Sequence, residues 1–371
     1  MQVSGLGQIS NVGLSVESTC AAQRAGVSRI ASIPGVTAYD PDALEAEIAG
    51  APVRGLTDGF FYNARWVLLA LESLRDLARN LDVSLEDSGY WRSTSIVWVL
   101  PELEFERFRI PGEKAEEFLR LACADVLLAL SRLPISPRDV HFIAAGPRGL
   151  VLACAKAQEM LRAGASQRVI LLATDSWLDP MSLLWLQEGG RLKAPEHPTG
   201  LCPGESGACA VLRTTPEPRG PASAARILSW SSSDSSSSPP PESGDLTAWR
   251  SEAAAAFGRA LAEAIERALV EARSKAPFRG SLILDLNGEI WRAMAWGHAQ
   301  VRLQRLIDFS ASKVVLPAIS FGDIGAAAPA AGLCIAARSF ARSYAAGSQA
   351  IVASVSDRGA VGALVIGAPD R

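Results

Sequence analysis

The chain has 371 residues, of which 49% are hydrophobic and 20% are charged, and its formal net charge is −3. This length suits two or more domains with large cores, and a charge that forms no long block of one sign argues against nucleic acid as a partner. No stretch reaches the roughly 20 apolar residues of a membrane span, and no basic and then apolar leader opens the chain. We therefore expect a soluble, cytoplasmic protein.

The cysteines and histidines give no sign of a metal site. The six cysteines occur singly in apolar or small-residue surroundings, without a CxxC pair, and none of the three histidines stands at metal-ligand spacing to a cysteine or another histidine. We expect reduced thiols in the core, no metal and no cofactor. The cysteines are Cys20, Cys123, Cys154, Cys202, Cys209 and Cys334.

The first third of the chain contains clear helix and strand signals. A short strand over Gln2 to Gly7 leads into a polar and less regular stretch. Apolar residues at helical spacing predict helices over Trp66 to Leu81 and over Glu116 to Arg132, and helices of this apolarity must be covered over much of their surface. Between them, the β-branched and aromatic run Thr94 to Leu100 is typical of a buried strand.

An ordered repeat links the two halves of the chain. In each copy a strand enters a glycine turn, a helix, a Gly-(x)-Ser-Gln segment and a buried strand that ends on Asp. The first copy consists of the strand Val140 to Ala145, the turn Gly146 to Gly149 and a second strand that ends on Asp175. The second copy consists of the strand Val314 to Ile319, the turn Gly322 to Gly325 and a second strand that ends on Asp357. The shared order indicates two copies of one right-handed βαβ unit with apolar parallel strands.

The repeat divides the chain into two related halves, residues 1–215 and 225–371. The boundary lies between Leu212 and Ala225, where a Thr- and Pro-rich stretch breaks secondary structure. A second interruption over Trp230 to Gly244, the 230–244 segment, is mostly serine with three consecutive prolines. It has little to bury, so we expect a surface loop there.

Three short segments, in order, resemble motifs of one enzyme family. Val3 to Gly7 followed by Asn11 to Gly13 resembles the N-terminal strand and turn of ketosynthases, Pro203 to Ala208 resembles their "RGEGAG" segment, and Gly322 to Ala328 resembles "GHxxGAAG". Together with the repeat, the chain resembles a β-ketoacyl synthase (3-oxoacyl-ACP synthase) of the thiolase superfamily. This resemblance implies an α/β fold of five layers, α-β-α-β-α, made of two pseudo-symmetric halves.

The family's nucleophile has no counterpart in this sequence. Ketosynthases hold a cysteine at the turn from strand to helix, where the helix N-terminus favours the thiolate. The matching turn places that cysteine near Pro147, and no Cys, Ser or Thr occurs from Ala144 to Ala153. Cys154 lies on the order of 10 Å further along the helix, so we interpret it as a packed core thiol. The resemblance therefore assigns no catalytic residue.

The two catalytic histidines of the family are also missing. The place of the first, in an "HGT" turn, falls on Asn287 or Leu286, and the place of the second falls on Asp323 in a segment one residue short. An ionised carboxylate cannot donate the hydrogen bond that a developing oxyanion needs. Nucleophile and both donors are thus absent together, which argues against decarboxylative condensation.

Other polar residues gather at strand ends, where α/β folds place binding loops. Ser356 to Gly359 replaces the family's "GFGG" loop, and its Asp357-Arg358 pair is either a solvent-facing ion pair or part of the pocket. Asp175, Ser176 and Arg191 are interpreted chiefly as structural, because an Asp at a strand end often caps the next turn. The candidate pocket or partner surface comprises Pro147, Arg148, Asp285, Asn287, Glu289, Asp323, Asp357 and Arg358, with Trp291, Arg292 and Trp296 adding aromatic and basic density beside it.

Three functions remain open at this point. The favoured one is a ketosynthase-like protein without condensing activity that acts as a partner, scaffold or acyl-chain binder. The resemblance implies a homodimer, or a heterodimer with a related ketosynthase, and contact with an acyl carrier protein or an acyl thioester. The alternatives are an acyltransferase that uses non-standard residues such as Asp323, Asn287 or Glu289, and a plain binding module that keeps only the fold.

Overall fold

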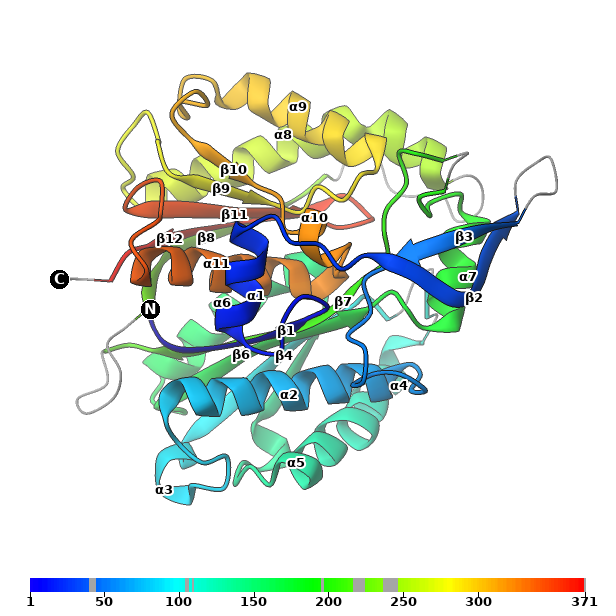
Figure 1. Cartoon of the computed structure of the whole chain (residues 1–371). Helices are drawn as coiled ribbons and strands as arrows, with labels where there is room; N and C mark the ends of the chain where they lie inside the picture. The colour runs from blue at the N-terminus through cyan, green and yellow to red at the C-terminus, as the bar shows by residue number, and fades with distance from the viewer. Residues whose placement is uncertain are drawn as a thin grey trace.

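The structure is a computed structural model that describes residues 1–39, 45–103, 107–108, 110–194, 197–215, 224–235 and 246–369. Helices and strands form five layers (Figure 1). From one side to the other these are α8 and α9, a first set of strands, the central helices α6 and α11, a second set of strands, and α2 with α5. The five-layer fold expected from the sequence is confirmed.

The strands of the two halves have the same order. In the first half the order is β5-β4-β6-β7-β1, and in the second it is β10-β9-β11-β12-β8. The halves are joined where β1 pairs with β8 at Gln2–Arg226 and Val3–Ala225. The strands are β1 (Gln2–Ser10), β4 (Thr94–Leu100), β5 (Val140–Ala144), β6 (Arg168–Ser176), β7 (Glu205–Arg213), β8 (Ala225–Asp234), β9 (Ser281–Leu284), β10 (Lys313–Val315), β11 (Gln349–Val355) and β12 (Ala360–Gly367).

Parallel and antiparallel pairs also match between the halves. β4 lies between β5 and β6 and is parallel to both, as β9 lies between β10 and β11 and is parallel to both. β6–β7 and β11–β12 are the corresponding antiparallel pairs. The apolar runs of β4 and β6 are buried along their whole length, because helices cover both faces of the sheet. The two βαβ units predicted from the repeat are therefore equivalent in space.

The two central helices begin in the same way. α6 (Gly149–Arg162) follows the 3-10 turn η3 (Gly146–Arg148), and α11 (Ala328–Ala341) follows η4 (Gly325–Ala327). Gly146 has φ 55° and Gly325 has φ 52°, a left-handed conformation that favours glycine. η3 and η4 contact each other, and both helices pack in one apolar cluster.

The outer helices cover the sheet on both sides. In the first half these are α2 (Asn63–Leu81) and a continuous helical stretch made of α4 (Gly112–Leu119), the π-helical η1 (Arg120–Ala124) and α5 (Asp125–Ser131). In the second half they are α8 (Leu246–Glu271) and α9 (Ile290–Leu303). The remaining helices are α1 (Val16–Arg24), α3 (Ser88–Trp91), α7 (Pro180–Glu188) and α10 (Ala318–Phe321). No described helix is both long and apolar enough to cross a bilayer.

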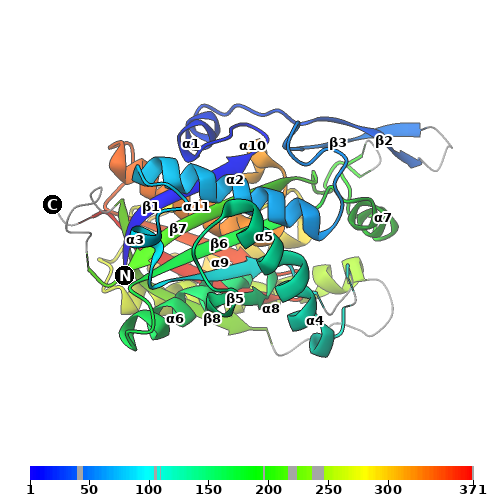
Figure 2. The same ribbon diagram turned by 90° about the horizontal axis from the view of Figure 1, so that it is seen from below.

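The stretch after Gly7 is more regular than its composition suggests. β1 continues to Ser10, and α1 follows with a capping box between Ser15 and Ser18. Next, β2 (Ala31–Tyr39) and β3 (Glu45–Gly50) form a separate antiparallel hairpin. Figure 2 shows this hairpin reaching away from the layered body.

Two predicted boundaries are wrong. The surface loop expected from Trp230 is wrong for Trp230 to Asp234, since β8 continues to Asp234 by pairing with β12 and buries alternate residues. The rest of the predicted loop, residues 236–244, lies outside the described part. The strand expected over Val314 to Ile319 ends at Val315, because Pro317 has no N–H for a ladder and starts the helical turn α10. We propose that the domain limits lie at residues 215 and 225, on either side of residues 216–223, which are outside the described chain.

Candidate functional site

The carboxyl ends of the parallel strands meet around a small cavity. Pro147 follows β5, the Asp285 to Glu289 loop follows β9, and Asp357 follows β11. This is the edge at which α/β folds place their binding loops. The cavity has a volume of about 20 Å³, and its lining includes Pro147, Asp285, Asn287, Arg292 and Asp323. The structure thus brings together the positions that the sequence comparison matched to the family's cysteine and two histidines.

Asn287 and Asp323 are bonded to each other in this cavity. The Asn287 side-chain amide donates to Asp323 Oδ2 at 2.6 Å and to Glu289 Oε2 at 2.9 Å. Asp323 Oδ1 accepts from the Gly325 N–H at 2.8 Å and from Trp177 Nε1 at 3.3 Å. Both oxygens of this buried carboxylate are therefore occupied, and the Asn287 amide nitrogen is used twice.

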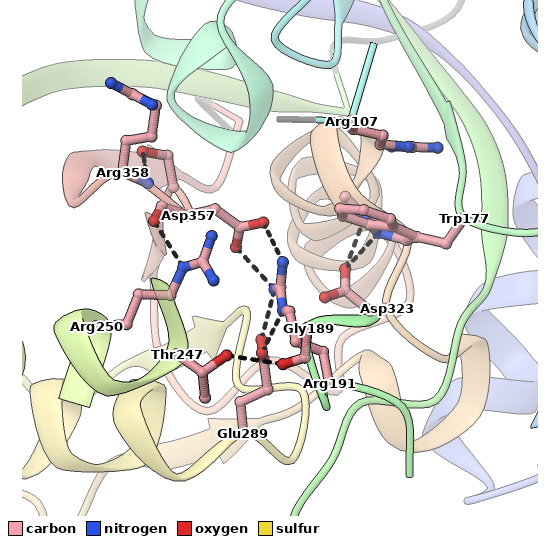
Figure 3. Close-up of polar contacts among 12 residues, drawn as sticks. Arg107, Trp177, Gly189, Arg191, Thr247, Arg250, Glu289, Asp323, Asp357 and Arg358 are labelled. Atoms are coloured by element: carbon pink, nitrogen blue, oxygen red, sulfur yellow. Dashed lines mark hydrogen bonds and ion pairs between the residues drawn. The ribbon is translucent and has the colours of Figure 1, made fainter. Parts of the chain in front are cut away.

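Arg191 is the centre of a buried ion cluster beside the cavity (Figure 3). It follows α7 in the first half, and its side chain is 1% exposed. Its Nε and Nη2 donate to the two oxygens of Glu289 at 2.7 and 2.9 Å, and its Nη1 and Nη2 donate to those of Asp357 at 2.8 and 3.1 Å. Such bidentate pairs fix geometry as well as charge. Because both carboxylates belong to the second half, this cluster ties the halves together.

The charges of this cluster hold one another in the ionised form. Burial is the largest single influence and would raise the pKa of Glu289 and of Asp357, but Arg191 and the neighbouring arginines together outweigh it, and both pKa values lie below the ordinary range. Burial likewise opposes the charge of Arg191, yet Asp357 and Glu289 raise its pKa well above the usual value. Arg250 and Arg292 also lower the pKa of Asp357. The Asp357-Arg358 pair considered from the sequence does not form the main contact, since Asp357 faces inward to Arg191.

The pKa of Asp285 shifts in the opposite direction, because for this residue the effect of burial is the stronger one. Burial raises its pKa to about 6, although Arg292 and the Val355 N–H act in the opposite direction. Arg292 Nη1 donates to Asp285 Oδ2 at 3.0 Å, and its Nη2 donates to Asp357 Oδ1 at 2.9 Å. Arg292 therefore connects the cavity wall to the ion cluster. Like Glu289 and Trp291, it is buried rather than presented on a surface.

Arg148 and Arg358 lie further out. Arg148 forms an ion pair with Asp234 at the end of β8, and both residues line a wider depression that Arg358 and Glu102 share. Arg358 is half-buried and also lines a second cavity next to the first. These two arginines are thus at the rim, whereas the other predicted residues belong to the closed polar network.

Sequence reasoning missed three residues that line a second cavity, namely Arg107, Trp177 and Trp185. This cavity has a volume of about 60 Å³, and its lining includes Pro147, Arg107, Asp175, Trp177 and Trp185. The rings of Trp177 and Trp185 are stacked, with centroids 5.9 Å apart. Trp177 directly follows β6, so a strand-end signal existed for it. Arg107 had no comparable signal, because it does not directly follow a strand.

The cysteines take no part in this site. All six are free thiols, and all but the half-buried Cys202 are buried. Cys154 packs inside the central layer, and burial raises its pKa to about 12, so it is a neutral core thiol as interpreted from the sequence. Within the described residues, no three His, Cys, Asp or Glu side chains are grouped to hold a metal ion.

Comparisons with known proteins identify the fold. No protein-family profile and no curated protein sequence match the chain. Among solved structures, it is similar to the ketosynthase complex AntDE:AntF, a type II polyketide synthase acyl-carrier protein in complex with its ketosynthase (TM-score 0.74, 14% identity, 99% of this chain and 98% of that one). It is also similar to the oxazolomycin ketosynthase domain OzmH KS7 of Streptomyces albus JA3453 (0.73, 15%, 100% and 75%). A third similar structure is the ishigamide ketosynthase/chain length factor (0.69, 18%, 100% and 99%).

These matches extend over essentially the whole chain at low sequence identity. They establish a thiolase-like ketosynthase fold, in agreement with the strand order and the five layers. At 14 to 18% identity the likeness concerns the fold alone. Function therefore has to be argued from the side chains of the site.

Proposed function

We propose that this protein is a ketosynthase-like protein without decarboxylative condensing activity, which acts as a partner or scaffold subunit. One observation carries the proposal. Pro147, Asn287 and Asp323, the positions that the sequence resemblance matches to the family's cysteine and two histidines, line one cavity of only about 20 Å³. Proline offers no nucleophile, and a carboxylate that only accepts hydrogen bonds cannot stabilise an oxyanion.

The size of the cavity favours a scaffold over an acyl-chain binder. A volume of about 20 Å³ holds roughly one water molecule. Pockets for small organic ligands usually measure about 300 to 1,000 Å³. An acyl chain would therefore require the cavity wall to move apart, and this wall includes the buried ion pair of Asp285 with Arg292.

The alternative of an acyltransferase with non-standard residues has less support. Asp323 and Glu289 would have to act as nucleophile or base, but both oxygens of each carboxylate already accept hydrogen bonds. The Asn287 amide is held between them. No group in this network is left in the free, reactive form that covalent catalysis requires.

Partnership with a similar protein is part of the proposal. The similar structures include a ketosynthase with its acyl-carrier protein and a ketosynthase/chain length factor. In this chain β5 ends the strand order of the first half, so its outer edge pairs with no described strand. An edge strand of this kind is usually covered. We propose that a second copy or a related ketosynthase covers it, with an acyl carrier protein as a further contact.

We expect sedimentation velocity to show a dimer of this chain, or a complex with a ketosynthase produced in the same cells. Replacing the exposed Ala144 on β5 by lysine should weaken this association, because a charge would enter an interface formed along the strand edge. Val314→Lys, on the opposite edge strand β10, is the matched control and should leave the mass unchanged. A monomer at high concentration that pairs with no ketosynthase contradicts this part of the proposal.

Lack of condensing activity is tested by intact mass after incubation with acyl and malonyl thioesters. We expect no covalent adduct and no decarboxylation of the malonyl thioester, with an active ketosynthase as positive control. Cys154→Ala should give the same result and cost on the order of 1 kcal/mol of stability, as expected for a small core thiol. An adduct on the wild-type chain refutes the proposal, and its loss in Cys154→Ala would show that the nucleophile lies further along α6.

A further inference from the structure

Arg107 is held inside the second cavity by a set of contacts that fits a guanidinium group. Its Nη1 donates to Asp175 Oδ1 at 2.8 Å, its Nε donates to Ser182 Oγ at 2.6 Å, and its Nη2 donates to the carbonyl of Ser176. The guanidinium carbon lies 4.0 Å from the centre of the Trp177 ring. A carboxylate, a hydroxyl, a carbonyl and an aromatic face together match the donors and the flat shape of this cation.

This receptor is built by other elements and exists apart from Arg107. Asp175 and Ser176 end β6, Ser182 is in α7, and Asp175 Oδ2 also accepts from the Ala326 N–H at 2.9 Å. The receptor side chains of Asp175 and Ser182 are fully or almost fully buried. Arg107 lies between β4 and α4 in the sequence, and its side chain is only 5% exposed. The pocket is therefore fixed, and the arginine is inserted into it.

Arg107 is the one cation that forms an ion pair with Asp175 among the described residues that line the cavity. Its carboxylates are Glu102, Asp175 and Asp357, and its other cations are Arg292 and Arg358. Arg292 is bonded to Asp285 and Asp357 rather than to Asp175. Without Arg107, the buried carboxylate of Asp175 would keep only backbone N–H partners, and a buried unpaired charge is costly.

We propose that Asp175, Ser176, Ser182 and Trp177 form a guanidinium-binding site that the chain fills with its own Arg107. Pro147 lines the same cavity, which Arg107 partly fills. A neutral acyl thioester cannot take the place of Arg107, because it brings no charge for Asp175. The ligands that can open the site carry a guanidinium group, or a primary ammonium group as a weaker substitute. This inference goes beyond the proposed function and does not depend on it.

The test is to empty the site and offer it a small cation. We expect Arg107→Ala to melt at a lower temperature than the wild type, and millimolar ethylguanidinium to raise its melting temperature by about 2 °C or more. The wild type should not respond, because its site is filled. Ethylurea, a neutral molecule of the same shape, should leave Arg107→Ala unchanged. Equal shifts with ethylurea, or no shift with ethylguanidinium, overturn the inference.

Two further variants separate this site from a general effect of added salt. The double variant Arg107→Ala/Asp175→Asn should lose the response, because the carboxylate that binds the cation is gone. Arg132→Ala removes an exposed arginine with a 74% exposed side chain and should show no response either. A response in either variant contradicts the inference.

A comparison of Arg107→Lys with Arg107→Gln applies if Arg107→Ala does not fold. The lysine variant should melt above the glutamine variant, since it keeps the cation beside Asp175, and equal stabilities overturn the inference. The thioester experiment does not involve this site. A covalent adduct in the thioester experiment would refute the proposed function and leave this inference standing. A failure of ethylguanidinium to stabilise Arg107→Ala would overturn this inference and leave the proposed function standing.

Discussion

Arg191→Met should lower the free energy of unfolding by about 3 to 5 kcal/mol, the loss typical of a buried ion pair that loses one partner. Methionine fills a similar volume but removes the bidentate partner of both Glu289 and Asp357, so that these two carboxylates have to share Arg292. Chemical denaturation at pH 7 measures the difference. Arg132→Met is the matched control, because its pair with Glu86 is exposed on both sides, and it should change stability by less than about 1 kcal/mol.

The same variant should show a defined pH dependence. The pKa values of Glu289 and Asp357 are lower in the folded protein than in the unfolded chain, so their contribution is complete above pH values of about 4 and is lost as the pH falls further. The difference between wild type and Arg191→Met should therefore shrink below about pH 4. A constant difference from pH 7 to pH 3 would mean that the loss comes from packing rather than from charge.

Gly7→Ala should lower the stability of the protein to a similar extent as Arg191→Met, because it inserts a methyl group between β1 and α2. A Cβ atom at Gly7 would lie 2.1 Å from the Ser73 carbonyl oxygen and 2.7 Å from the Leu77 nitrogen, and both are backbone atoms that cannot move aside alone. Overpacking of this kind costs up to about 3 kcal/mol or more. Thermal unfolding and the yield of folded protein measure the effect.

Gly297→Ala is the control for the glycine substitution. Gly297 lies inside α9 and has no left-handed φ, and a Cβ atom added there would meet no other atom within 4 Å. Alanine there should stabilise the protein by about 0.5 to 1 kcal/mol, since it favours the helix. If both variants had the same effect, the close approach of β1 to α2 would not explain the cost.

Local patterns were sufficient to predict most of the fold. The alternation of apolar strands, glycine turns and helices identified both βαβ units, and Gly146 and Gly325 have the same conformation at equivalent positions. The serine-rich stretch predicts a loop from Trp230 onwards, although β8 continues to Asp234, because a run of serines does not show the apolar alternation of a half-buried strand. The hairpin β2–β3 was missed because its residues show neither the period nor the apolarity of a core strand. Propensity fails where pairing with a distant strand decides the structure.

The site was predicted only in part, for a reason that lies in distance along the chain. Asn287 and Asp323 could be placed from motifs, whereas Arg191 meets Glu289 across 98 residues and Asp357 across 166 residues. Nothing near Arg191 or Arg107 in the sequence indicates their partners. Ion pairs of this kind depend on the finished packing of both halves, so a single sequence does not indicate them.

The central layer also determines how the molecule comes apart. α6 packs on β4 and β6 of its own half and on β8 and β12 of the other, and α11 likewise contacts β9 and β11 as well as β1 and β7. Each central helix therefore completes the core of both sheets. A half that separated would expose one face of its sheet and one face of its helix to water at once. We therefore expect the two halves, despite their internal symmetry, to unfold together in a single transition rather than one after the other.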